Sequence, residues 1–188
     1  MIETAAIVNI QDFLDRWRQM GSRKLTSGTE LIGEVPTEDG ELWMHAIYPK
    51  LPLASLEKLQ TQLGQSLPRD LRALYRLTRG ISLFQGAFRV YGKRASSFGF
   101  GYEDPLAQPD DLLQLNHEIE ALGWKPSHAI AFAVNGWDQS VHLFGMTNKP
   151  RQIARCDRST GKVLELHESI WECLMARLYK LDQLFVRS

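Results

Sequence analysis

The chain has 188 residues, 44% of them hydrophobic and 23% charged, which is the composition of an ordinary globular domain with a sizeable core. Its 22 basic and 22 acidic residues balance to a formal net charge of zero, so overall charge gives no attraction to nucleic acid or to an anionic membrane. Two cysteines are too few for a disulfide scaffold, and no apolar run is long enough to span a bilayer. Met1 to Ile10 lacks the pattern of a signal peptide, and we therefore expect a cytoplasmic protein with reduced cysteines.

The N-terminal part of the chain predicts one helix and a pair of strands. The elements expected here are a helix over 10–20, a mobile polar stretch over 22–28, and strands over 31–35 and 41–48. Asn9 suits the N-cap of the helix, and Gly21 suits its end. Asp39 and Gly40 form a turn signal between the two strands.

The middle of the chain predicts three helices and one short strand. These are helices over 55–63, 67–80 and 109–123, and a strand over 88–91. Ser55 and Gly64 suit the N-cap and the end of the first helix. In the second helix, Pro68 fits the first position, Asp70 suits the positive end of the helix dipole, and Gly80 is placed to end the helix.

The last part of the chain predicts four short strands and a final helix. The strands are expected over 129–134, 140–144, 151–156 and 162–166, and the helix over 169–184. Short strands joined by tight turns form an antiparallel meander, and the apolar side of the final helix would cover it. Because helices precede and follow this sheet, the sequence predicts an α+β fold: an antiparallel sheet flanked by N-terminal helices and a C-terminal helix.

Short motifs in this chain stand in a definite order: Leu67-Pro68-x-Asp70-Leu71-x-x-Leu74-Tyr75, Arg79-Gly80, Ala129-Ile130-Ala131-Phe132-Ala133, Asn135-Gly136-Trp137-Asp138 and Val141-His142-Leu143-Phe144. This order, with a final helix after it, resembles the SUKH superfamily, which includes the yeast cell-wall-assembly regulator type. The resemblance covers residues 49–184 of one SUKH-like domain over 1–188, with residues 1–48 as an N-terminal extension or a divergent start. The family pattern has Asn-Gly where this chain has Arg79-Gly80, but the glycine is the residue that the turn most requires.

The resemblance implies a non-enzymatic protein-binding domain. Many bacterial members look like immunity proteins that neutralise a toxin, and others act as interaction modules; the sequence does not choose between these roles. We expect a protein partner, for example a bacterial toxin, that is blocked sterically by a rigid surface with aromatic anchors and complementary charge. No cofactor is expected, and the sequence gives no oligomeric state.

Two short segments supply the first candidate partner-binding residues. Trp137 lies in a turn, where it could anchor an interface or fold back onto the sheet edge. Asp138 beside it could act as a general base or could bond to the backbone of the turn. Phe100 and Tyr102 belong to an aromatic-glycine loop that could line a pocket or merely turn a corner.

A basic stripe supplies the other candidates. Its four members are three or four residues apart and share one face of the predicted helix: Arg69, Arg72, Arg76 and Arg79. Arg72 and Arg76 are the members that we expect to bind the carboxylates of an acidic partner. The alternative is an ordinary solvated face of an amphipathic helix.

An enzymatic alternative depends on other residues. It is a hydrolase or a small-molecule-binding protein that uses a pocket near Gly99 to Tyr102 with Asp138 or His142. A convergent pocket with a strongly perturbed titratable group would favour this alternative, and an open surface would favour the binding module. The five histidines and two cysteines show no ligand spacing, so the sequence predicts no metal site.

Overall fold

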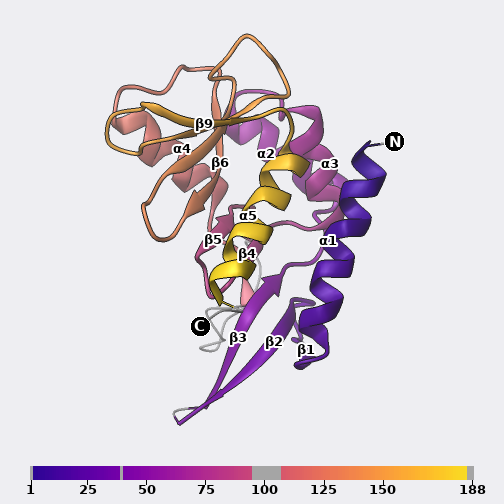
Figure 1. Ribbon diagram of the computed structural model, residues 1–188. Coiled ribbons are helices and arrows are strands. Elements are labelled where there is room, and N and C mark those ends of the chain that lie inside the picture. The colour runs from indigo at the N-terminus through magenta and orange to yellow at the C-terminus, as the bar shows by residue number, and fades with distance from the viewer. Residues whose placement is uncertain (1, 39, 95–106, 186–188) are drawn as a thin grey trace.

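The protein is described by a computed structural model that covers residues 2–38, 40–94 and 107–185, with side chains from residue 10 onward (Figure 1). The helices of these ranges are α1 (Ile2–Arg18), α2 (Leu53–Leu63), α3 (Arg69–Leu77), α4 (Leu112–Ala121) and α5 (Ile170–Phe185). The strands are β1 (Ser22–Lys24), β2 (Glu30–Thr37), β3 (Gly40–Ile47), β4 (Ile81–Leu83), β5 (Phe88–Val90), β6 (Ile130–Asn135), β7 (Val141–Phe144), β8 (Ile153–Cys156) and β9 (Val163–His167).

The described strands form one antiparallel sheet in which each strand pairs with the next in sequence, from β1 to β9. This arrangement confirms the meander predicted from β6 to β9 and the predicted pair of β2 and β3. The predicted α+β fold is also confirmed, with α1 before the sheet, α5 after it, and α2, α3 and α4 inserted between strands. The register places His142 opposite Arg155 and Arg155 opposite Glu165, so three neighbouring strands carry polar residues in one row.

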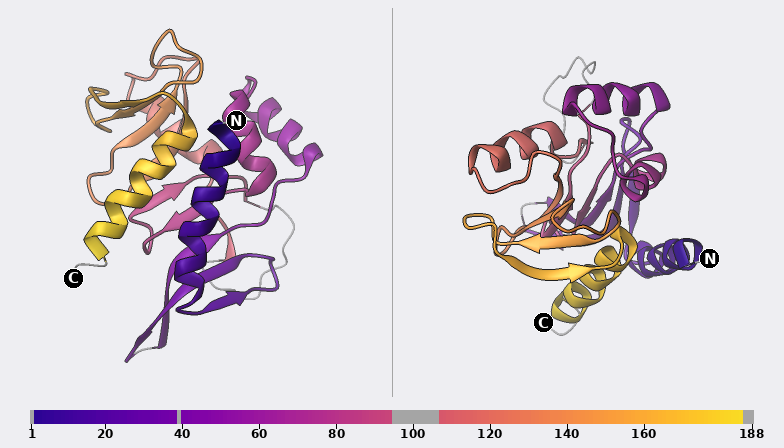
Figure 2. Two further views of the ribbon diagram at one scale, coloured as in Figure 1. Left: turned by 45° about the vertical axis from the view of Figure 1, so that its right-hand side comes forward. Right: turned by 90° about the horizontal axis from the view of Figure 1, so that it is seen from above.

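Helices cover both faces of the C-terminal part of the sheet (Figure 2). On one face α5 packs beside α1, and the larger hydrophobic core contains Phe13, Phe132, Leu174 and Leu178. On the other face α4 packs on β6 around a smaller core. The final helix therefore covers the meander, as its apolar periodicity predicts. No helix of the described ranges has the length and apolar character needed to cross a membrane.

The N-terminal helix and the strand after it correct two expectations. Helix α1 begins at Ile2, so Asn9 lies inside the helix and not at its N-cap. No glycine or proline precedes Gly21, and nothing in the sequence therefore stops the helix from starting earlier. The stretch 22–28 contains strand β1, whose three residues are polar and exposed because β1 lies at the edge of the sheet.

The ends of α2 and α3 differ in part from the expected ones. Pro52 and Pro68 stand at the N-caps, so Ser55 is not a capping residue and Pro68 precedes the first helical position. Gly64 ends α2 with a φ of 68°, as predicted. Helix α3 already ends at Leu77, so Gly80 does not end it. Gly80 instead allows Pro109 to pack closely against the backbone, because a Cβ at position 80 would lie 2.7 Å from the Cβ of Pro109. The unpredicted strand β4 follows immediately.

Candidate functional site

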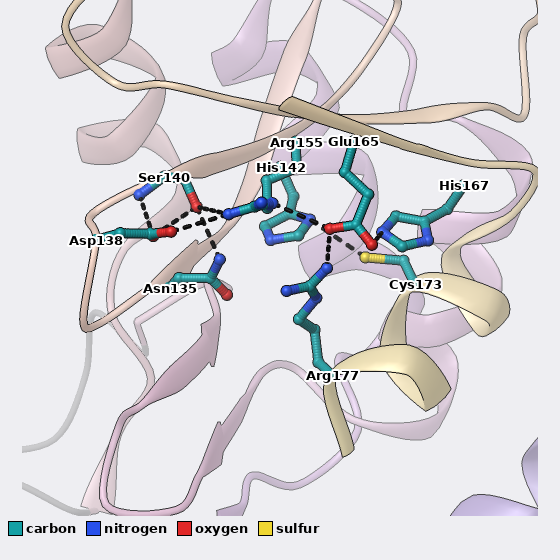
Figure 3. A network of polar contacts seen from close by, with 9 residues as sticks. All are labelled: Asn135, Asp138, Ser140, His142, Arg155, Glu165, His167, Cys173 and Arg177. Atoms are coloured by element: carbon teal, nitrogen blue, oxygen red, sulfur yellow. Dashed lines mark hydrogen bonds and ion pairs between the residues drawn. The ribbon is translucent and has the colours of Figure 1, made fainter. Parts of the chain in front are cut away.

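The turn between β6 and β7 is fixed by a network of polar contacts (Figure 3). One carboxylate oxygen of Asp138 accepts hydrogen bonds from the backbone N–H and the hydroxyl of Ser140, at 2.9 and 2.7 Å. The side-chain amide of Asn135 donates to the Ser140 hydroxyl at 2.7 Å. Partial burial of Asp138 opposes ionisation, but these hydrogen bonds and the charge of Arg155 outweigh it and lower the pKa of the carboxyl. Asp138 is therefore ionised and bound to its own turn, which is the structural role considered for it.

Backbone packing also constrains this turn. The N–H of Gly136 donates to the carbonyl of Ala87 at 2.9 Å, and a Cβ at Gly136 would lie 2.5 Å from the Gly86 carbonyl. Gly136 is therefore required for close approach of two loops. The left-handed residue of this turn is Gln139, with a φ of 55°.

Trp137 projects from the rigid turn. Its side chain is 65% exposed, and its ring meets the ring of Phe185 edge to face at 6.2 Å between centroids. Trp137 is thus not folded back onto the sheet edge. Beside it lies a shallow hollow of about 100 Å³, lined by Ala87, Asn135, Trp137, Asp138, Arg155, Arg177, Lys180, Leu181 and Leu184. An exposed indole, apolar side chains and cationic groups therefore share one small surface, which we call the Trp137 surface.

A chain of charges runs inward from the Trp137 surface. Nη1 of Arg155 lies 2.8 Å from Asp138, and Nε of Arg155 lies 3.1 Å from Glu165 (Figure 3). Arg177, which is only 5% exposed, binds the same Glu165 carboxylate. Burial opposes ionisation of Glu165, but the charges around it, Arg177 first, lower its pKa. The two arginines are thus held in place by carboxylates behind the surface that they line.

Behind the charged residues, a thiol and two imidazoles lie together. This thiol–histidine cluster consists of His142, His167 and Cys173, all of them buried. Burial lowers the pKa of His142 well below its usual value and raises the pKa of the Cys173 thiol to about 12. A hydrogen bond joins the neutral thiol and the neutral imidazole, with Sγ 3.2 Å from Nδ1 of His142. A buried thiol with a raised pKa is a poor nucleophile.

The basic stripe contains fewer exposed residues than predicted. Arg69, Arg72 and Arg76 are exposed on α3, whereas Arg79 follows the end of the helix and is only 7% exposed. The prediction of four arginines on one face is therefore wrong for Arg79, because the helical periodicity stops at Leu77. Arg72 and Arg76 do not line the hollow at Trp137.

The residues of the enzymatic alternative are not brought together among the described residues. Asp138 lines the hollow beside Trp137, but His142 is fully buried and does not line it. A larger hollow of about 460 Å³ lies elsewhere, beside Trp43, Ser82 and Arg89, and contains neither Asp138 nor His142. Phe100, Tyr102 and the whole Gly99 to Tyr102 segment lie outside the described residues.

Several residues of the site were not singled out from the sequence. Arg155, Glu165 and His167 stand on strands, and Cys173 and Arg177 lie on the buried side of α5. One signal was available: Arg177 occupies an apolar position in the helical pattern of α5, where an arginine requires a partner.

In comparisons with protein-family models and with curated proteins, neither a family model nor a curated protein matches this chain.

Proposed function

We propose that this chain is a non-enzymatic protein-binding module of the SUKH type that neutralises its partner, for example a toxin, by covering the partner's active surface. The observation that carries this proposal is the 65% exposed Trp137 on a turn that Asp138 and Ser140 hold rigid. Tryptophan is enriched among the residues that dominate binding energy, and a fixed turn loses little conformational entropy on binding. The α+β architecture, with the final helix covering the sheet, agrees with the resemblance in the sequence.

The chemistry of the Trp137 surface favours an acidic partner. Leu184 is 46% exposed beside the indole, and Lys180 on the same helix is exposed as well. Arg155 contributes a guanidinium group to the hollow that these side chains line. An apolar anchor bordered by three cationic groups and the one carboxylate of Asp138 fits a protein loop that carries both an apolar side chain and carboxylates.

The test is capture of the partner by the tagged full chain in its native cells, followed by an assay of the partner's own activity. Trp137→Ala should weaken binding at least about tenfold, which corresponds to about 1.4 kcal/mol. Wild-type protein should inhibit the captured partner stoichiometrically, and the variant should inhibit it less.

Leu53→Ala is the matched control, because Leu53 is a similarly exposed apolar residue, at 59%, on the distant helix α2. It should bind and inhibit like the wild type. Equal binding by Trp137→Ala and the wild type would exclude the Trp137 surface, and turnover of a substrate by the purified chain would favour the enzymatic alternative. That alternative stays a prediction with no supporting contact among the described residues.

A further inference from the structure

The thiol–histidine cluster combines three potential metal ligands from three different elements. His142 lies on β7, His167 ends β9, and Cys173 lies in the first turn of α5. One ring nitrogen of each histidine and Sγ of Cys173 all lie within 4.8 Å of one another. The three residues are between 0% and 4% exposed. The ligand spacing that is missing along the sequence is therefore provided by the fold.

The hydrogen bonding of the cluster is incomplete. The contact from Cys173 to Nδ1 of His142 uses one ring nitrogen. Nε2 of His142 and Nε2 of His167 are buried and have no hydrogen-bond partner among the described residues. A buried polar atom without a partner costs free energy, so two such atoms beside one thiol require an explanation.

The charges around the cluster permit a bound cation. Glu165 lies beside it, with Oε1 3.5 Å from Nε2 of His167. Arg155 and Arg177 also face this region, and their charges oppose a cation. Glu165 and Asp138 already balance the two arginines. A divalent ion that displaces the thiol proton of Cys173 gains a thiolate, which offsets half of its charge.

We propose that His142, His167 and Cys173 form a binding site for one zinc ion that fastens α5 to β7 and β9. Two imidazoles and one thiolate are the borderline-soft donors that Zn²⁺ prefers. In the binding step Zn²⁺ forms a bond to Sγ, the S–H bond breaks, and the proton leaves to solvent. Bonds of about 2.0 Å to nitrogen and about 2.3 Å to sulfur put tetrahedral ligands roughly 3.5 Å apart, so the three ligand atoms need to approach one another by only about 1 Å.

The direct test is metal retention by the full-length chain. The purified protein is treated with a chelator, desalted, mixed with an excess of Zn²⁺ and desalted again before elemental analysis. The wild type should retain about one zinc per chain and unfold at a higher temperature with zinc than without it. Cys173→Ala and His167→Gln should lose both effects.

Cys156→Ala is the matched control, because Cys156 is a second fully buried cysteine that is not part of the cluster. It should retain zinc like the wild type. Retention of less than about a tenth of an equivalent by the wild type would overturn the proposal. Equal retention by Cys173→Ala and the wild type would also overturn it, because the zinc would then be bound elsewhere.

Circular dichroism shows whether each variant folds. Where a variant does not fold, the absorption of bound Co²⁺ in the wild type and in Cys156→Ala tests the site instead. Co²⁺ replaces Zn²⁺ at such sites and absorbs in the near ultraviolet when a thiolate binds it. A saturable thiolate–Co²⁺ band in the wild type and in Cys156→Ala would support the site. Absence of the band in the folded wild type would overturn it.

Discussion

Two regions of this protein contain buried histidines, and the regions differ in the side chains that surround the imidazole rings. His45 lies in an aromatic cluster with Phe13, Trp17 and Phe84, whose ring centroids are 4.7 to 5.8 Å from the imidazole. His142 and His167 instead lie beside a thiol and a carboxylate. Burial lowers the pKa of a histidine in both places, but only the thiol–histidine cluster offers further donors to a ligand.

The largest effect should follow from opening the aromatic cluster. Phe84 is 1% exposed, and its ring contacts the rings of Phe13, Trp17, His45 and Phe185. Phe84→Ala should lower the free energy of unfolding by about 3–5 kcal/mol, because it removes those contacts and leaves a cavity. Urea unfolding would measure the loss. A loss below about 1 kcal/mol would mean that the cluster collapses around the cavity.

The pH dependence of the free energy of unfolding tests how burial in the aromatic cluster changes the protonation of His45. Burial lowers the pKa of His45 from 6.5 to about 3, so the unfolded chain binds this proton more readily than the folded one. The contribution of neutral His45 to the free energy of unfolding is therefore fully present above pH 6.5 and is lost as the pH falls from 6.5 toward 3. One proton corresponds to about 1.4 kcal/mol per pH unit.

His45→Phe should reduce that slope by about one proton in urea unfolding measured between pH 6.5 and pH 4. Phe13→Leu is the control, because it alters the same cluster without removing a titratable group. It should lower stability equally at each pH. An unchanged slope in His45→Phe would assign the acid sensitivity to other groups, His142 first among them.

A smaller effect is expected from the charged residues beside the thiol–histidine cluster. Glu165→Gln leaves the buried Arg177 without its carboxylate, and we expect a loss of about 1–3 kcal/mol. Glu41→Gln breaks an exposed ion pair with Arg23, about half exposed on both sides, and should change stability by less than about 0.5 kcal/mol. Thermal unfolding of both variants would test the difference, and equal losses would contradict it.

The smallest effect on stability should come from the exposed face of α3. Arg72→Glu together with Arg76→Glu should change the free energy of unfolding by less than about 0.5 kcal/mol, because both side chains are exposed. An acidic partner that docks there would associate more slowly with this variant, most visibly at low salt. Normal binding by the double variant would identify the stripe as a solvated face. Unfolding would instead show that these arginines stabilise the fold.

The meander could be predicted because its signals are local. Alternating apolar residues and turn residues such as Asp157 and Gly161 define each hairpin without reference to the rest of the chain. Trp137 and Asp138 could be proposed as candidates for the same reason, since both lie in one turn. The predicted stripe includes Arg72 and Arg76 correctly as exposed residues of α3, but it is wrong for Arg79, because the helical pattern was extended past the end of α3.

The inner part of the site could not be predicted, because it depends on packing. Residues 142 and 155 come together through strand register, and Cys173 reaches His142 only when α5 docks on the sheet. Ligand spacing along the sequence detects sites within one helix or hairpin, and this cluster combines two strands with a helix. The alternation of Glu165 and His167 on β9 was the one available sign that their side chains share a face.

The strictly sequential strand order also has a consequence for how the chain folds. Most neighbouring strands are joined by short connections, so their pairing costs little loop-closure entropy and keeps the contact order of the sheet low. Two pairings are different: α2 and α3 separate β3 from β4, and α4 and the long connection from Val90 to Ile130 separate β5 from β6. We expect these two closures to limit the folding rate, with the amides of β2 and β3 protected from hydrogen exchange before those that join β3 to β4 and β5 to β6.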